Sequence, residues 1–344
     1  MKSAVALALI SFMTASAQNY TASRVQVDGI QVIRLTDKAR NVEVSIVPSI
    51  GNTAYEMKVN GKNAFWFPAE SLAAYKAKPV FSGNPFLGPW ANRLDHAGFY
   101  ANGKHYSLDR TLKNYRTDAH DHPIHGLLTY AKEWEVADLK ATDSGSEVRS
   151  RLEFWRYPDY MAQFPFAHTI DMIYRLQNGA LEVETVIENH AAEPMPVSVG
   201  YHPYFKIHDA PRDQWKVTLA AKDSVVLSPQ LVPTGETKPL PYKNPLNLAG
   251  VALDDVMSGL IRTESGRAEF IVEGAKQKIS VLYGPKYPVA VVYAPAGRDF
   301  ICFEPMSGPT NALNLHHAGK YPELQTIQPR GTWRESFWVV PSGF

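Results

Sequence analysis

The chain has 344 residues, of which 45% are hydrophobic, 11% aromatic and 20% charged; this ordinary globular composition excludes long disorder and collagen-like repeats. Its 35 Lys and Arg residues against 34 Asp and Glu residues give a net charge of +1. With no basic block or acidic tail, it lacks the main attraction for nucleic acid or an anionic membrane surface. The single cysteine, Cys302, excludes an internal disulfide and any metal site built from several cysteines.

The first 17 residues are typical of a secretory signal peptide. Lys2 supplies a short positive segment, residues 4–13 are apolar and uncharged, and residues 15–17 (Ala-Ser-Ala) form a small-residue cleavage site. The apolar run is too short to cross a bilayer, which takes about 20 apolar residues. The alternative is an N-terminal core strand, but strands do not carry this three-part order. We therefore expect an exported protein, periplasmic or secreted, with no membrane contact after cleavage.

Four alternating segments predict β-hairpins, because each centres on an Asn-Gly or Asp-Gly pair whose residues tolerate positive φ. These segments are residues 24–36, 55–67, 99–108 and 169–187. Further strands are predicted over 134–140, 147–155, 215–220, 268–272, 279–283, 289–293, 300–303 and 336–340. The best helical candidate, residues 70–78, is barely two turns long. The pattern predicts an all-β protein, a large antiparallel β-sandwich with few short helices.

No domain boundary is visible after the signal peptide. The polar stretch 231–247 contains four prolines and could be a linker. We interpret it as a long surface loop, because strand patterning of the same composition resumes on both sides. We expect a single β-sandwich domain over residues 18–344; the lack of a fixed repeat argues against a propeller.

Asn92 and Arg93 form the first polar cluster. They lie in the segment 83–94, where two glycines and two prolines prevent regular structure. An arginine in such a loop can fork onto sugar hydroxyls or a carboxylate. Alternatively, it braces the loop through backbone carbonyls.

Three histidines within six residues, His120, His122 and His125, suggest a metal site. Their spacing resembles the zinc motif of the metallo-β-lactamases, but Ile124 occupies the aspartate position of that motif, and the helices that flank sheets in that superfamily are missing. Zinc bound by histidine alone stays open. Gly126, directly after His125, would let a ligand or another backbone come close, and we expect His120 to be solvated.

A third cluster surrounds His202, which follows a strand in the segment 197–205. A histidine near its ordinary pKa can both give and accept a proton at neutral pH. Tyr204 and Phe205 could supply an aromatic surface for the apolar face of a sugar ring. The alternative is a half-buried structural histidine.

Acidic residues complete the candidates. Glu304 follows an apolar strand and precedes Pro305, so we expect it at a sheet rim, where partial burial would raise its pKa as suits a general base. Asp254 and Asp255 could cap a turn or accept a hydrogen bond from a hydroxyl. Cys302 is flanked by apolar residues and is expected to be buried and unreactive.

In chain order these motifs resemble the aldose 1-epimerase (galactose mutarotase) family. The resemblance spans about residues 47–340, and its most specific segments are Ala91-Asn-Arg-Leu94, Gly200-Tyr-His-Pro-Tyr-Phe205 and Glu304-Pro-Met306. It implies a large antiparallel β-sandwich with the sugar in an open groove. It also implies interconversion of the α and β anomers of free hexoses without a metal, nucleotide or other cofactor.

The resemblance further implies a role for each site residue. Glu304 would be the general base and His202 the general acid, while His125 and Arg93, beside Asn92, would hold sugar oxygens. Asp254 would accept a hydrogen bond from a ring hydroxyl. The family usually has a second glycine after His-Gly, where this chain has Leu127, and many members have a different polar residue at the position of His122. Both departures leave the preferred sugar open.

Three alternatives remain. A hexose 6-phosphate mutarotase would need a cluster of basic residues at the groove, where the sequence offers only Arg93, and export argues against phosphorylated substrates. A non-catalytic carbohydrate-binding protein would need the groove without the acid–base pair. A zinc hydrolase would use the three histidines. The sequence does not indicate an oligomeric state.

Overall fold

The computed structural model describes residues 19–344, so the signal peptide predicted over residues 1–17 lies outside the described residues. The prediction of an all-β antiparallel fold with few short helices is confirmed. The strands are β1 (Tyr20–Val27), β2 (Ile30–Asp37), β3 (Val42–Val47), β4 (Thr53–Val59), β5 (Lys62–Asn63), β6 (Phe86–Leu87), β7 (Gly98–Ala101), β8 (Lys104–Ser107), β9 (Arg116–Thr117), β10 (Pro123–Ile124), β11 (Glu135–Thr142), β12 (Gly145–Glu153), β13 (His168–Gln177), β14 (Ala180–Asn189), β15 (Met195–Pro196), β16 (Gly200–Tyr201), β17 (Tyr204–Phe205), β18 (Lys216–Thr218), β19 (Ala221–Leu227), β20 (Pro233–Pro239), β21 (Leu246–Asn247), β22 (Leu253–Leu260), β23 (Ala268–Glu273), β24 (Lys278–Tyr283), β25 (Val289–Ala294), β26 (Ile301–Met306), β27 (Thr326–Ile327) and β28 (Thr332–Ser342). The α-helices are α1 (Leu72–Ala77), α2 (Pro158–Gln163) and α3 (Ala312–His317).

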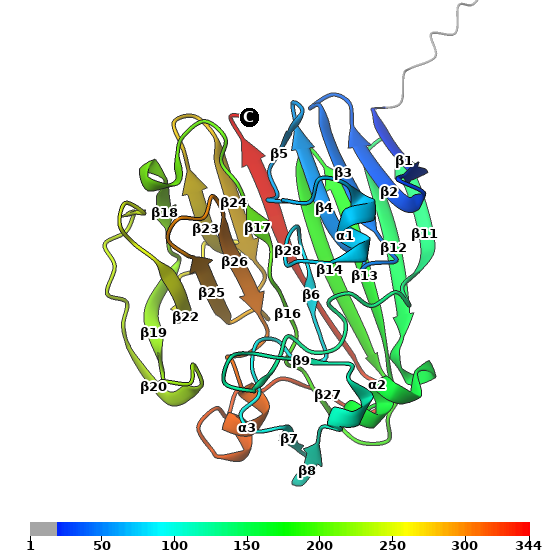
Figure 1. The fold of residues 1–344 in the computed structure, drawn as a ribbon, viewed down its shortest axis with the longest axis vertical. Coiled ribbons are helices and arrows are strands. Elements are labelled where there is room, and N and C mark those ends of the chain that lie inside the picture. The colour runs from blue at the N-terminus through cyan, green and yellow to red at the C-terminus, as the bar shows by residue number, and fades with distance from the viewer. Residues whose placement is uncertain (1–18) are drawn as a thin grey trace, which may run out of the picture.

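The strands form a sandwich in which one long sheet faces two smaller ones (Figure 1). The long sheet has nine strands in the order β11-β12-β13-β14-β28-β24-β23-β18-β21. The five-stranded sheet β1-β2-β3-β4-β5 lies over its β11–β13 part. An eight-stranded sheet, β20-β19-β22-β25-β26-β16-β6 with β17 also paired to β26, lies over its β23–β28 part. Within residues 19–344, no helix has the length and apolarity that crossing a membrane requires.

All four predicted hairpins form with the predicted turns. In each, the Asn or Asp of the turn has a φ of 50–52° and the following glycine a φ of 74–80°, the left-handed conformations that suit a two-residue hairpin. The flanking strands pair directly across the turn, as Val27 does with Ile30 and Gln177 with Ala180. The second strand of the 55–67 hairpin is short, however, and ends at Asn63.

Other boundaries differ from the predictions. The stretch 231–247 is not a continuous loop, because it contains β20 and β21. β20 is the edge strand of its sheet, where a proline's missing N–H is tolerated, and so its prolines concealed it. The strand predicted over 147–155 ends at Glu153 in a 3₁₀ turn. The helix predicted over 70–78 is α1, capped by the Ser71 hydroxyl, which accepts a hydrogen bond from the Ala74 N–H at 3.0 Å.

The main core fills the space between the two layers. Phe303 on β26 meets Phe270 on β23 with 5.9 Å between ring centroids. Since neighbouring residues of a strand face opposite sides, Cys302, Glu304 and Met306 point outward from the sandwich. Met306 belongs to one small apolar cluster on this outer face and Cys302, fully buried as predicted, to another. Glu304 is therefore placed between two apolar clusters.

A backbone clamp holds the loop after β10 against the segment 83–94. The Leu127 N–H donates to the Gly88 carbonyl oxygen at 2.7 Å, and the His125 N–H donates to the Asn92 carbonyl oxygen at 2.9 Å. Gly126 has a φ of +65°, and a Cβ added there would lie 2.1 Å from the Gly88 carbonyl oxygen. The glycine beside His125 therefore serves the approach of another backbone.

Replacing Gly126 by alanine is expected to lower the free energy of unfolding by about 2–5 kcal/mol, because strain at positive φ adds to a clash with backbone. Gly61→Ala is the matched control. Gly61 has a φ of +80° but nothing within 4 Å of an added Cβ, so only the conformational cost of about 1–2 kcal/mol applies. Urea denaturation of the two variants measures the difference. An equal loss of unfolding free energy in the two variants would contradict the close backbone contact at Gly126.

Candidate active site

The structure brings Glu304 and His202 together on the outer face of the eight-stranded sheet. The His202 Nε2 atom lies 3.3 Å from the Glu304 Oε1 atom. Strand pairing causes this contact: β16 pairs with Met306 and β17 pairs with Cys302. The turn between β16 and β17, which carries His202, therefore faces the intervening Glu304.

Glu304 is buried more deeply than the sequence predicted. It lies inside β26 rather than at a sheet rim, and only 1% of it is exposed. β26 continues through Pro305 because Pro305 pairs only with Ala290 on the β25 side, while β16 and β17 diverge on the other.

Burial shifts the two proton affinities in opposite directions. It raises the pKa of Glu304 well above its ordinary value, and the Asp254 carboxylate adds to the rise while Arg93 opposes it. This confirms the predicted direction. Burial lowers the pKa of His202 to about 3, below the ordinary histidine range considered from the sequence. Burial disfavours whichever form is charged, so both groups favour their neutral forms.

His125 completes a cluster of rings around the pair. Its ring centroid lies 5.5 Å from that of His202, and the Phe81 ring lies 5.0 Å from His125 and 5.5 Å from His202. Burial, followed by the neighbouring positive charges, lowers the pKa of His125 well below its ordinary value. The buried His125 Nδ1 atom has no hydrogen-bond partner among the described residues, nor has the Glu304 Oε2 atom. Because buried polar atoms are normally paired, these two are available to ligand atoms.

Of the two aromatic residues predicted to contact a sugar, the structure places only one at the site. Tyr204 stacks on His202 with centroids 4.7 Å apart. Phe205 is fully buried and stacks on Phe65 at 5.6 Å. Consecutive residues of β17 face opposite sides of the sheet, so Phe205 belongs to the core.

Arg93 is fixed by two neighbours. Its Nε donates to Asp118 Oδ2 at 2.7 Å, and its Nη1 donates to Asn92 Oδ1 at 3.0 Å. Asn92, only 6% exposed, thus orients Arg93 through its side-chain oxygen. The Arg93 charge favours the ionised forms of both Asp254 and Glu304. No sequence pattern marked Asp118 as a site residue, because its role depends on its contact with Arg93, which lies 25 residues away in the chain.

Asp254 lies on a strand, so of its two alternatives turn capping is excluded and the role as a hydroxyl acceptor stays a prediction. In β22 it pairs with Tyr293 of β25, which in turn pairs with Cys302 of β26. Cross-strand partners share a face, so Asp254 lies on the same outer face as Glu304. Its side chain is exposed, yet desolvation raises its pKa above the ordinary value, helped by Asp255 and opposed by Arg93.

The three clustered histidines do not converge. His125 faces His202, whereas His122 lies against Asp118, with its Nδ1 atom 3.6 Å from Oδ2. His120 is exposed, as predicted. Across residues 19–344, no group of three or more His, Cys, Asp or Glu side chains is placed to hold a metal ion.

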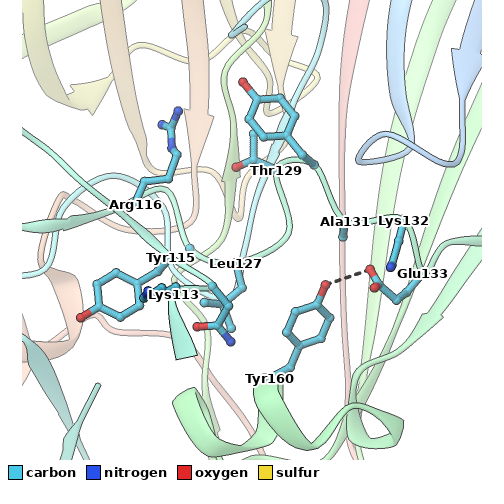
Figure 2. Close-up of a pocket in the computed structure, with 12 residues that line it drawn as sticks. Lys113, Tyr115, Arg116, Leu127, Thr129, Ala131, Lys132, Glu133 and Tyr160 are labelled. Carbon is cyan, nitrogen blue, oxygen red and sulfur yellow. Dashed lines mark hydrogen bonds between the residues drawn. The ribbon is translucent and has the colours of Figure 1, made fainter. Parts of the chain in front are cut away.

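Sequence reasoning also missed Phe81, Tyr293 and Arg116. Arg116 lies on β9, where it pairs with Ile124 of β10, the residue before His125. Arg116 also lines a hollow of about 320 Å³ that Gly126 lines as well (Figure 2). In this hollow the Tyr160 hydroxyl donates to Glu133 at 2.9 Å. No local pattern marks these residues, because only the tertiary fold brings them beside the histidines.

Comparisons with known proteins identify the fold and the family. The fold is similar to solved structures of a galactose mutarotase-like protein from Clostridium acetobutylicum (20% identity, TM-score 0.84, covering 95% of this chain and 100% of that chain) and of a protein from Synechocystis (26% identity, TM-score 0.72, 97% and 100%). A galactose 1-epimerase from Lactobacillus acidophilus is similar at 14% identity and a TM-score of 0.67, with 95% and 99% covered. The family model for aldose 1-epimerase matches residues 31–339. The chain therefore belongs to the aldose 1-epimerase family.

Proposed function

We propose that the chain interconverts the α and β anomers of free hexoses of the glucose and galactose type by acid–base opening and closing of the sugar ring. The observation that carries the proposal is the buried pair of Glu304 and His202, whose Oε1 and Nε2 atoms lie 3.3 Å apart. Anomer exchange must move protons at O1 and O5, two atoms bonded to the same carbon. Two proton-transfer groups must therefore sit side by side, as these do.

Ring opening begins with the ion-pair form of the two side chains. The Glu304 carboxylate takes the proton of the C1 hydroxyl, His202 donates its proton to O5, and the C1–O5 bond breaks to give the open aldehyde. Rotation about C1–C2 then presents the other carbonyl face. His202 takes back the O5 proton as O5 attacks C1, while Glu304 returns its proton to O1. In each step one side chain gives a proton to the sugar and the other takes one from it, so the total number of protons on the two side chains does not change.

The depth of burial suits the open-chain intermediate. After ring opening both side chains are neutral, the state that burial favours for Glu304 and His202. The ion pair and the neutral pair hold the same total number of protons and titrate as one unit. Sugar hydroxyls that enter the site would stabilise the ion pair by hydrogen bonding, which keeps both directions of transfer accessible.

Neighbouring residues would bind the rest of the ring. Arg93, held by Asp118, can donate to sugar oxygens, while Asp254 on the same sheet face can accept from a hydroxyl. The free Nδ1 atom of His125 can bond to a further oxygen. Tyr204, stacked on His202, offers a flat surface for ring C–H groups. A binding-only protein would have no use for the buried acid–base pair.

Glu304→Gln is expected to lose about 10²–10⁴-fold in turnover, the usual contribution of a proton-transfer partner, while it still binds sugar. Polarimetry of freshly dissolved α-D-glucose and α-D-galactose at low temperature, with EDTA present, measures the rate above the uncatalysed blank. Glu269→Gln on β23, across the sandwich, is the matched control and should match the wild type. If Glu304→Gln keeps more than about a tenth of wild-type turnover, the assigned base is wrong.

The pH profile of kcat/KM should lack an acid limb in the ordinary histidine range. Activity requires one proton shared by the pair, and a second proton would add to His202, whose pKa burial lowers to about 3. We therefore expect kcat/KM to stay level from pH 7 down to about pH 5 and to fall on the alkaline side, where the pair loses its proton. A loss centred near pH 6.5 would contradict the assignment of His202.

Glu304→Gln should also stabilise the fold, and more so as pH rises. The pKa of Glu304 is raised in the folded state above the ordinary 4.5, so this carboxyl stabilises the fold fully only below that pH, and its contribution is lost towards the raised value. Glutamine does not ionise. Thermal unfolding should show little difference from wild type near pH 4.5 and a higher Tm for the variant at pH 8. A difference that is the same at both pH values would contradict the buried, raised-pKa carboxyl.

A further inference from the structure

Arg116 is a cation at the site that no acid of the described residues neutralises. Its side chain is exposed, and no ion pair or side-chain hydrogen bond holds its guanidinium among residues 19–344. The other arginines of this region are paired, Arg93 with Asp118 and Arg110 with Asp121, each at 2.7 Å. The N–H donors of Arg116 are therefore free to bind a ligand.

The Arg116 side chain is nevertheless held in place beside the histidines. Its Cζ atom lies 4.3 Å from the centre of the Phe81 ring, and that ring lies 5.0 Å from His125 and 5.5 Å from His202. A cation over an aromatic face is attracted by it. In Figure 2 the Arg116 guanidinium points away from Lys113. One aromatic ring thus separates it from both histidines.

The two arginines influence different members of the site. The Arg93 charge lowers the pKa of Glu304 and of Asp254. The Arg116 charge lowers the pKa of His202. Both arginines lower the pKa of His125. In the proposed mechanism His202 protonates O5. C5 is bonded to O5 and carries C6, so a substituent at C6 lies on the histidine side of the ring, towards Arg116.

We propose that Arg116 forms an anion subsite and that the aldose carries a carboxylate at C6, as in a hexuronate. The proposal rests on the proposed function, which places C6 beside His202. A guanidinium matches a carboxylate through two parallel hydrogen bonds. A phosphate carries about −1.5 to −2 charges, which one arginine would leave partly uncompensated. Both ligands share anionic oxygens, and the test separates them.

The surroundings of Arg116 favour an anion as well. The adjoining hollow is lined by Lys113 and Lys132 in addition to Arg116, and by a single acid, Glu133, whose carboxylate accepts the Tyr160 hydrogen bond. Excess positive charge at a rim attracts anionic ligands. A bound carboxylate would also offset the Arg116 charge and so ease protonation of His202, which ring opening requires.

The test compares kcat/KM for α-D-galacturonate, α-D-galactose and α-D-galactose 6-phosphate near pH 7.5. In the wild type, galacturonate should exceed galactose by about 10- to 100-fold, the range of a charge-assisted hydrogen bond. Arg116→Gln should lower the galacturonate-to-galactose ratio by the same factor. Arg24→Gln is the matched control: it removes one charge from an exposed arginine on β1 in the five-stranded sheet and should leave the ratio unchanged.

Three results would overturn the proposal: a preference for galactose in the wild type, an unchanged ratio in Arg116→Gln, or a higher kcat/KM for the 6-phosphate than for galacturonate. Calorimetric binding of galacturonate and galactose to the Glu304→Gln protein separates failure of the subsite from failure of the epimerase proposal. If no sugar is turned over but galacturonate binds in an Arg116-dependent manner, the epimerase proposal fails and the subsite stands. Equal binding of the two sugars would overturn the subsite.

Discussion

The desolvation of a carboxyl and an imidazole, held together on an apolar sheet face, is the constraint on which the site depends. Glu304 and His202 lie 3.3 Å apart, with Glu304 between the apolar clusters around Met306 and Cys302. Burial raises the pKa of the acid and lowers that of the base, which reverses the order the two groups have in water. The neutral pair is then the favoured form, and ligand hydroxyls can stabilise the ion pair and so shift the balance. A reaction whose return step repeats its forward step with acid and base exchanged needs both forms to be accessible.

The fold holds the pair by backbone rather than by side-chain contacts. His202 faces Glu304 because the strands on either side of it pair with the residues flanking Glu304 on β26. His125 is held by hydrogen bonds between its own loop and the segment that carries Arg93. The positions of all three side chains therefore depend on strand pairing and a backbone clamp. Such contacts tolerate changes of neighbouring side chains, which is consistent with a shared fold among structures at 14–26% identity.

Two arginines at the site have different surroundings and so different consequences. Arg93 is neutralised and oriented by Asp118 and Asn92, so it can hold a neutral hydroxyl at a fixed place. Arg116 rests on an aromatic ring and has no ion-pair partner among residues 19–344. An uncompensated cation beside buried histidines disfavours their protonated forms, a cost to the reaction that an anionic ligand would relieve. Substrate recognition and proton affinity would thereby be coupled through one side chain.

By itself, the sequence determined the fold class and all four hairpins, and it singled out Glu304 and His202 as the candidate acid–base pair. Hairpin turns depend on two adjacent residues that tolerate positive φ, and strand faces depend on alternation, so both are local properties. The tertiary structure alone decided that Glu304 lies inside a strand, that Asp254 shares its face, and that Phe205 belongs to the core. It also decided the pKa of His202 and brought Arg116 to the site. Burial, proton affinity and contacts between distant segments depend on what surrounds a residue in space, and local sequence does not contain that information.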